Sequence, residues 1–220
     1  MLLSRRRFNR SILSALGGIL GASMLSPALA DLLEGRDWRL IDPPQPSDTP
    51  GKIEVLEFFS YGCPHCSDLN LIVNSWSKGL AADVSFRRVP VSFGRAAWSS
   101  LAQFYYALES TGDLERLDQS VFDALHKQRL RLFTKPAILD WVVEHGVDSK
   151  AFSDAFDSFD VQTKLSRSDY LVGRYRIDAV PTITVAGRYA VLGREVKALP
   201  ELLTIADGLI AKARAEGIAG

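Results

Sequence analysis

The apolar run KIEVLEFFS (52–60) is the feature that most limits how this chain can fold. It is rich in β-branched and aromatic side chains, and it lacks the alternation expected of a strand with one face in water. Such a run is typical of a strand that is buried on both faces, at the centre of a sheet covered by helices. We therefore expect an α/β fold built around this strand.

The segments on either side predict the rest of the sheet. GCPHCSDLNLIVNSWSKGL (62–80) follows the run at once and carries apolar residues at helical spacing, so a helix is expected to begin at the cysteines. The other predicted elements are a brief strand and a proline-rich loop in 37–51, a strand in 83–93, a strand pair in 181–193 with a turn at Gly187-Arg188, and an amphipathic helix in 199–217.

Between about Gly94 and Tyr175 the pattern is almost wholly helical. Five segments there each have an apolar stripe with a cap or a breaker nearby: 96–110, 114–128, 135–146, 149–158 and 161–175. A small mixed sheet whose sequence is interrupted by a helical insertion fits this order of elements.

The first 30 residues have the composition of a secretory signal peptide. A basic start, MLLSRRRFNR, precedes a Gly- and Ala-rich apolar stretch and an Ala-x-Ala site, which predicts cleavage after Ala30. A single membrane anchor is the alternative, but the apolar stretch is short and broken by glycines, whereas a span needs about 20 apolar residues. SRRRFNR (4–10) resembles the twin-arginine export pattern and equally suits a basic Sec signal, so the export route stays open.

Export changes the charge balance of the chain. The leader holds four of the 26 basic residues and no acid, so 22 basic and 26 acidic residues remain and the net charge is −4. This balance argues against a nucleic-acid surface, which needs a dense basic patch. An exported protein also works where disulfides persist.

The chain has only two cysteines, Cys63 and Cys66. A structural zinc site needs four ligands, and with one cysteine pair and three histidines (His65, His126, His145) no metal site is predicted; a two-coordinate soft metal such as Cu(I) is the alternative. A cysteine protease needs a histidine base that reaches the thiol, and His65 is poorly placed for that. Redox exchange fits the pair best.

The local physics of a helix start supports redox exchange. If the helix begins here, Cys63 is the N-cap, Pro64 takes the favoured N1 position, His65 is N2 and Cys66 is N3. The free N–H groups and the helix dipole then stabilise the Cys63 thiolate and lower its pKa. Because a stabilised thiolate favours the reduced form, the disulfide would be a strong oxidant.

With these residues in view, the segment VLEFFSYGCPHC (55–66) resembles the DsbA family of thiol:disulfide oxidoreductases in the thioredoxin superfamily. The similarity runs over nearly all of residues 35–220. It implies a thioredoxin fold with an inserted helical domain, in which 31–93 and 176–220 form the thioredoxin-like domain and 94–175 the insertion.

The resemblance implies roles for further residues. Pro181 in DAVPTITV would be the cis-proline beside the active-site cysteines, and the backbone of Val180 would face a bound substrate strand. Glu57 would be a buried acid that handles the proton of Cys66, since a carboxylate in an apolar strand is costly to bury unpaired.

Two neighbouring arginines, Arg88 and Arg87, are candidate charge partners for Glu57, and the sequence does not choose between them. An arginine at that place departs from the lysine that is common in the family, and it would hold a fixed charge. For the other acid of the strand, Glu54, we expect a position at the strand end that reaches solvent.

These observations favour a periplasmic dithiol oxidase that donates the Cys63–Cys66 disulfide to newly exported proteins, with no cofactor. The resemblance implies reoxidation by a membrane quinone reductase of the DsbB type, and a monomer is expected. Two alternatives remain: a reductase or isomerase of the thioredoxin superfamily, and a peptide-binding chaperone or copper carrier without turnover.

Overall fold

The computed structural model describes residues 32–218. The signal-peptide interpretation of residues 1–30 lies outside this range and stays a prediction. Within the range, no helix is long and apolar enough to cross a lipid bilayer. The elements in chain order are β1 (Trp38–Leu40), β2 (Ile53–Phe59), α1 (Pro64–Lys78), β3 (Val84–Pro90), α2 (Ala96–Thr111), α3 (Leu114–His126), α4 (Lys135–Glu144), α5 (Ser149–Phe156), α6 (Phe159–Tyr175), β4 (Thr182–Val185), β5 (Tyr189–Val191) and α7 (Pro200–Ala215).

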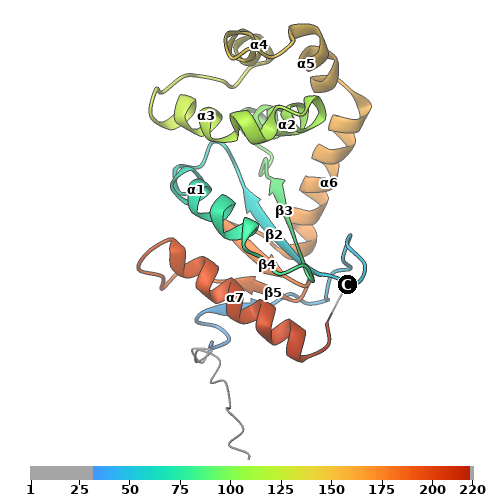
Figure 1. The fold of residues 1–220 in the computed structure, drawn as a ribbon, viewed down its shortest axis with the longest axis vertical. Helices are drawn as coiled ribbons and strands as arrows, with labels where there is room; N and C mark the ends of the chain where they lie inside the picture. The colour runs from blue at the N-terminus through green and yellow to red at the C-terminus, as the bar shows by residue number, and fades with distance from the viewer. Residues whose placement is uncertain (1–31, 219–220) are drawn as a thin grey trace, which may run out of the picture.

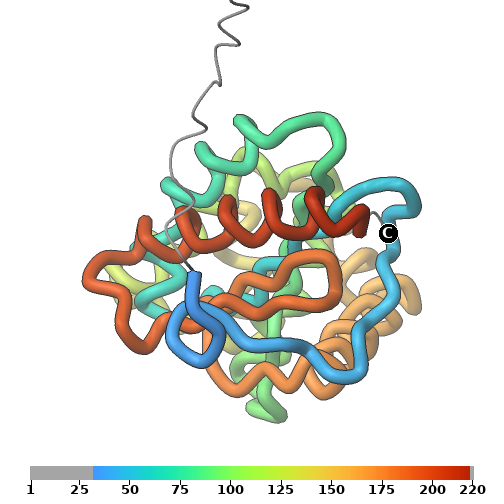
Figure 2. Tube along the Cα trace, turned by 90° about the horizontal axis from the view of Figure 1, so that it is seen from below, coloured from blue at the N-terminus to red at the C-terminus, as the bar shows by residue number. Residues whose placement is uncertain are grey.

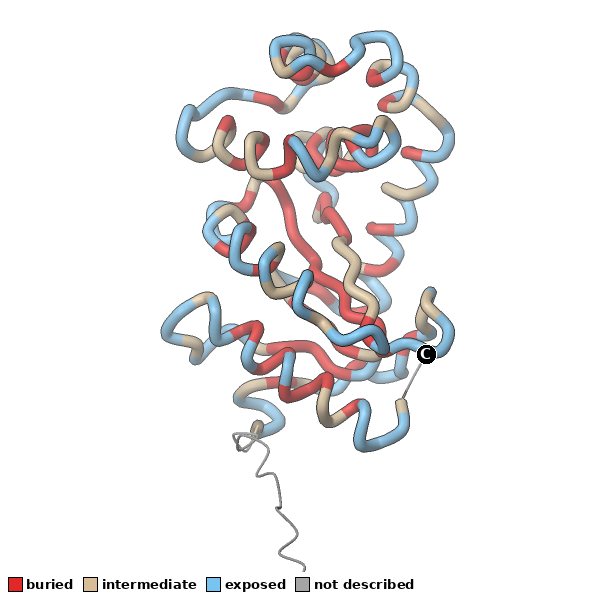
Figure 3. The backbone as a smooth tube through the Cα atoms, in the orientation of Figure 1, coloured by how far each residue is buried: buried red, intermediate tan, exposed pale blue. Residues whose placement is uncertain are grey.

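The strands form one five-stranded mixed sheet in the order β1-β5-β4-β2-β3. β2 pairs in parallel with β3 and antiparallel with β4, so it has a neighbour on both edges. All its residues are buried, as the lack of alternation in this largely apolar run predicts, and Figure 3 shows the central strands in the buried colour. The prediction of an α/β fold around this strand is confirmed.

Helices cover both faces of the sheet, and the alternation of β2 decides which side chains meet which helices. Ile53 and Val55 pack in one cluster with α1 and α7, whereas Leu56 and Phe58 pack in another with α6. Figure 1 shows α1 and α7 on the same side of the sheet, and Figure 2 shows α7 running alongside the β4–β5 pair. Because the alternation continues to the end of β2, Glu57 lies on the face that α1 covers.

The helical insertion, α2 to α6, interrupts the sheet between β3 and β4, as the sequence order predicts. Helices α2, α3, α4 and α5 gather above the end of β2 in Figure 1, and α6 returns the chain along the sheet. Phe59, Tyr61 and both cysteines belong to the same apolar cluster as the insertion. The start of α1 therefore lies at the boundary between the sheet and the inserted helices.

Two expectations are corrected. The β4–β5 hairpin exists, but its central residues are Ala186 and Gly187, both with positive φ, rather than Gly187-Arg188. Glu54 does not reach solvent: it is 2% exposed, and its Oε1 accepts a hydrogen bond from Arg87 at 3.2 Å. The physical reason is that β2 is an interior strand with helices on both faces, so no side chain along it points to water.

Candidate active site

The first turn of α1 places the two cysteines as the sequence predicts. Cys63 is the N-cap with extended backbone (φ −100°, ψ 119°), Pro64 opens the helix, and the Cys66 amide donates to the Cys63 sulfur at 3.4 Å. Both cysteines are free thiols in this structure. Cys63 is 6% exposed and Cys66 is fully buried, so an incoming sulfur reaches Cys63 first.

The surroundings shift the pKa values of the two thiols in opposite directions. The pKa of Cys63 is lowered from 9.0 to about 7 by a hydrogen bond from the Cys66 thiol, with further contributions from the Cys66 and His65 amides and the charge of His65, against the effect of burial. Burial raises the pKa of Cys66 above its ordinary value, and the hydrogen bond to Cys63 and the nearby charges of Cys63 and Glu57 add to that rise. Cys63 is the group prepared to be a thiolate at neutral pH.

A loop from the far end of the chain completes the site. The Cys63 thiol donates to the carbonyl oxygen of Val180 at 3.4 Å, although 117 positions separate them. The Val180–Pro181 peptide bond is cis, as the resemblance implies, and β4 begins directly after it. The backbone before Pro181 therefore lies against the reactive sulfur.

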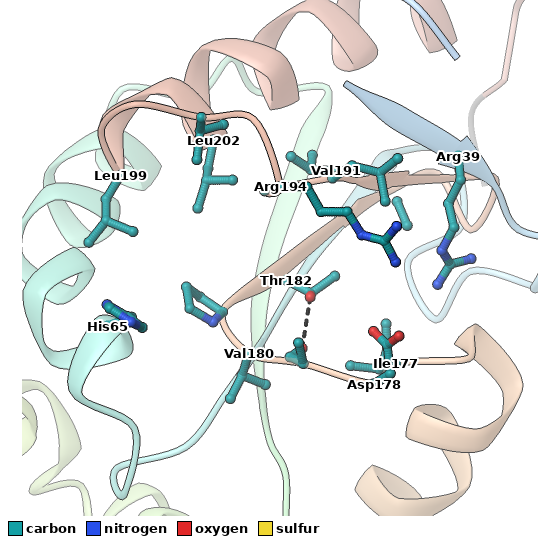
Figure 4. A pocket seen from close by; sticks show the side chains of 16 residues that line it. Arg39, His65, Ile177, Asp178, Val180, Thr182, Val191, Arg194, Leu199 and Leu202 are labelled. Carbon is teal, nitrogen blue, oxygen red and sulfur yellow. Dashed lines mark hydrogen bonds between the residues drawn. The ribbon is translucent and has the colours of Figure 1, made fainter. Parts of the chain in front are cut away.

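A cavity of about 520 Å³ extends from this loop. In Figure 4, His65 lies at one end of the cavity, beside Leu199, and the guanidinium groups of Arg39 and Arg194 lie at the other. Apolar side chains from the loop, β5 and the start of α7 line the space between them: Ile177, Val180, Val191, Leu199 and Leu202. This lining suits a ligand with apolar groups.

Glu57 is fully buried, and its partner is Arg88. Arg88 Nε donates to Glu57 Oε2 at 2.7 Å, while Glu57 Oε1 has no hydrogen-bond partner among the described residues. Burial raises the pKa of Glu57, and the charge and hydrogen bond of Arg88 counteract part of that rise. The charge of Glu57 also adds to the raised pKa of Cys66. Proton exchange between Glu57 and Cys66 stays a prediction.

Strand register decides which arginine pairs with which acid. β2 and β3 run in parallel with Glu57 opposite Arg88, so both side chains lie on the face covered by α1. Arg87 points to the other face, where it bonds Glu54 and Asp48. The choice that the sequence left open follows from the alternation of side chains along a strand.

Three neighbours of the site were not predicted from the sequence. Asp118 of α3 bonds Arg88, a ring nitrogen of His126 lies 2.7 Å from the carbonyl oxygen of Tyr61, and the Trp98 indole packs so closely that a Cβ on Gly62 would lie 2.7 Å from its Nε1. All three come from the insertion, far from the cysteines in sequence. No local signal marks them, because ordinary helical residues become neighbours of the site only through packing.

The described residues contain no group of three or more His, Cys, Asp or Glu side chains arranged to hold a metal ion. His126 and His145 each face a backbone carbonyl oxygen instead, those of Tyr61 and Trp141. The chemistry that the arrangement supports is thiol–disulfide exchange at Cys63. Together, the mixed sheet, the cysteine pair at a helix start and the cis-proline loop define a thioredoxin-fold thiol:disulfide oxidoreductase.

Comparison with known proteins agrees with this class. The family model described as DSBA-like thioredoxin domain matches residues 54–199. The thiol:disulfide interchange protein DsbA of Bordetella pertussis is 43% identical over 172 residues, which cover 77% of this chain and 80% of the relative. The protein of the same name from Burkholderia cepacia is 36% identical over 201 residues, covering 91% and 93%. The chain belongs to the DsbA family.

Solved structures of the family share the fold. The crystal structure of Pseudomonas aeruginosa DsbA superposes with a TM-score of 0.80 at 36% identity, covering 83% of this chain and 95% of the other. That of the oxidoreductase DsbA from Xylella fastidiosa gives a TM-score of 0.77 at 30% identity, covering 83% and 98%. The thioredoxin fold with a helical insertion, expected from the sequence, is confirmed by these superpositions.

Proposed function

We propose that this protein is a periplasmic dithiol oxidase that donates its Cys63–Cys66 disulfide to newly exported proteins. The observation that carries the proposal is the position of Cys63 at the start of α1, with the Cys66 amide 3.4 Å from its sulfur. The lowered pKa of Cys63, about 7, means that the reduced enzyme holds a stabilised thiolate. A disulfide whose reduced form is stabilised is a strong oxidant.

The exchange proceeds in two displacements. A substrate thiolate attacks the Cys63 sulfur of the disulfide, the bond to Cys66 breaks, and Cys66 leaves as a thiolate that takes up a proton. A second substrate thiolate then attacks the substrate sulfur of this mixed disulfide, and Cys63 leaves as a thiolate. The substrate loses two electrons and gains a disulfide, and the enzyme ends as the dithiol.

Each predicted site residue has a part in this scheme. The His65 charge and the N1 position of Pro64 favour the Cys63 thiolate at the helix start. The backbone of Val180 and Pro181 aligns an extended substrate segment beside Cys63, and the cavity next to it receives that segment's apolar side chains. Glu57 supplies and accepts the proton of Cys66.

The proposal also includes the location of the protein, its partners and its domains. Residues 1–30 direct export and are removed, and the mature protein works in the periplasm on unfolded or folding exported chains. A membrane quinone reductase of the DsbB type returns Cys63 and Cys66 to the disulfide. Residues 31–93 and 176–220 form the thioredoxin-like domain, and 94–175 the inserted helical domain.

Two measurements on the mature protein test the proposal. Equilibration with glutathione redox buffers gives the reduction potential of the pair, and a value toward about −120 mV, the potential known for DsbA, is expected. A value toward about −270 mV, the thioredoxin range, contradicts a disulfide donor. The Cys63→Ser variant should not oxidise a reduced, unfolded test protein. Cys66→Ser, given oxidised glutathione, should accumulate a Cys63–glutathione mixed disulfide, because no second thiol is present to displace the glutathione.

A further inference from the structure

Asp118 lies on α3, outside the thioredoxin-like part of the chain, yet it reaches the charged groups beneath the cysteines. Its Oδ1 accepts hydrogen bonds from Tyr61 at 2.8 Å and from Arg88 at 3.1 Å. Its Oδ2 accepts from Arg88 at 3.0 Å, Asn70 at 2.9 Å and Asn74 at 3.3 Å. In every one of these contacts an oxygen of Asp118 is the acceptor.

One guanidinium thereby serves two buried acids. Arg88 donates through Nε to Glu57 at 2.7 Å and through Nη1 to Asp118 at 3.0 Å, and its side chain is only 8% exposed. No other lysine or arginine within residues 32–218 forms an ion pair with either acid. The guanidinium also stacks over the Phe59 ring at 3.9 Å, which fixes its place between the two carboxylates.

The two acids affect each other through this shared charge. Burial raises the pKa of Glu57, Arg88 counteracts part of the rise, and the negative charge of Asp118 adds to it. In a site with little water, charges a few ångströms apart interact by kilocalories per mole, so one neighbouring charge is enough to shift a proton equilibrium. The negative charge of Asp118 offsets part of the positive potential that Arg88 produces at Glu57. Without Asp118, that potential would be higher and Glu57 would hold its proton less tightly.

We propose that Asp118 is a positioning residue for dithiol exchange: by sharing Arg88 with Glu57, it keeps Glu57 basic enough to take the proton of Cys66 when Cys66 closes the disulfide. The inference rests on the proposed function and assigns a task to the helical insertion. It makes the chemistry of the thioredoxin-like half depend on a side chain that α3 supplies.

The step that depends on Asp118 is ring closure. Cys63, joined to a partner sulfur in a mixed disulfide, is attacked by the Cys66 sulfur; the Cys66 proton passes to Glu57, the Cys63–Cys66 bond forms, and the partner leaves as a thiolate. The titratable and charged groups around the cluster are Cys66 from α1, Arg88 from β3, Asp118 from α3, Tyr105 from α2 and Tyr61. Burial raises the pKa of both tyrosines, so they stay neutral over the pH range in which a carboxyl group titrates.

The alternative is that Asp118 only holds α3 against α1. Such a structural residue would, when replaced, slow closure by the same factor at every pH. A residue that tunes Glu57 would instead change the pH at which closure becomes fast, because closure requires Glu57 to be ionised. The pH profile of closure distinguishes the two.

The experiment follows closure in the mature protein. Reduced protein is mixed with oxidised glutathione from about pH 4 to about pH 8, a range chosen to include ordinary and raised carboxyl pKa values. Samples are acid-quenched, and mass spectrometry measures the decay of the Cys63–glutathione mixed disulfide. The variants are Asp118→Asn, Asp118→Ala and, as a matched control on the same helix, Asp123→Asn, whose carboxylate pairs with Lys127 at the surface.

Asp118→Ala is included because Asp118→Asn could destabilise the fold. An amide at position 118 would face only donors, and an unsatisfied buried donor is destabilising. A crevice of about 240 Å³ between α1 and α3 has Arg88 and Asp118 among its lining residues, so water can enter the space left by Asp118→Ala and accept the orphaned hydrogen bonds. Thermal melts of both variants check the fold.

We expect the midpoint of the closure profile to move down by about one pH unit in both variants, because Glu57 then holds its proton less tightly. The rate at high pH should also fall several-fold, since a weaker base accepts the Cys66 proton less readily. In a Glu57→Gln background, Asp118→Ala should shift no midpoint. Asp123→Asn should match the parent protein.

An unmoved midpoint in a folded variant, or equal slowing at every pH, overturns the proposal. So does failure of both variants to fold, which would make Asp118 a residue of the fold alone. These outcomes leave the dithiol oxidase standing if the parent protein keeps a potential near about −120 mV. A parent potential near about −270 mV contradicts the proposed function itself, whatever the variants do.

Discussion

The sulfur of Cys63 lies 3.4 Å from the carbonyl oxygen of Val180, a residue 117 positions later in the chain. The helix start of α1 stabilises the thiolate, and the loop before β4 presents backbone to the same atom. Substrate backbone aligned along that loop would bring a substrate sulfur to Cys63 rather than to the fully buried Cys66. Two separate segments of the chain, the start of α1 and the loop before β4, thus meet at one sulfur.

Replacing His65 should raise the pKa of Cys63 above about 7. His65→Ala removes the side-chain charge that favours the thiolate and keeps the backbone N–H that also does so, so the shift should be partial. The ultraviolet absorbance of the thiolate, followed against pH in the reduced protein, measures it, and the reduction potential should become less oxidising in step. His145→Ala, at the end of α4, is the control. If His65→Ala leaves the pKa of Cys63 unchanged, the His65 charge does not stabilise the thiolate.

The stability of the reduced protein should increase with pH between about 7 and 9, relative to the oxidised protein. The pKa of Cys63 is about 7 in the folded protein and 9.0 for an ordinary thiol. The stabilisation of the folded state by the Cys63 thiolate is therefore fully present above pH 9.0 and is lost as the pH falls through about 7. Cys66 stays protonated in this window because its folded pKa is raised. Urea unfolding of both redox forms measures the difference.

The Cys63→Ser variant supplies the control for that pH dependence. Without the Cys63 thiol, the stability of the reduced protein should not increase over the same pH window. If Cys63→Ser and the reduced parent respond alike to pH, the gain has another source, such as groups that titrate in both redox forms.

Removing Arg88 should cost stability sharply. Arg88→Met leaves Glu57 and Asp118 buried without their cation, and breaking a buried ion pair from one side costs about 3–5 kcal/mol. Part of the loss should return as pH falls, because the orphaned carboxyl groups then take up protons. Arg214→Met, which breaks a half-exposed pair with Asp83, should cost much less in the same urea titration. Equal losses would mean that the Arg88 cluster contributes no more than a surface pair.

Two glycines should respond oppositely to alanine. Gly187 has φ +61°, and a Cβ there would lie 2.1 Å from the Gln45 carbonyl oxygen, so Gly187→Ala must move the β4–β5 turn and should destabilise by about 1–3 kcal/mol or more. Gly173 lies in α6 with nothing near its Cβ position, so Gly173→Ala should stabilise by about 0.5–1 kcal/mol. Thermal melts of the two variants decide; a neutral Gly187→Ala would show that the turn yields readily.

The fold was predictable from the sequence to an unusual degree, for a reason visible in β2. Apart from Glu54 and Glu57, its residues are apolar because the strand is interior, and the lack of alternation in the sequence indicates this directly. Glu54 is the exception in this strand. A carboxylate near a strand end was expected in solvent, and only the packed α6 face reveals it as buried beside Arg87.

The sequence by itself determined the reactive half of the site, because a helix cap is a local structure: Cys63, Pro64 and Cys66 are within three positions of one another, and their mutual geometry follows from the helix start. Only the tertiary structure decided the rest. Successive side chains of a strand point to opposite faces, so the choice of Arg88 over Arg87 needed the register between β2 and β3. The contact of Cys63 with Val180 and the presence of Asp118 beside Arg88 needed the packing of segments that no local pattern connects.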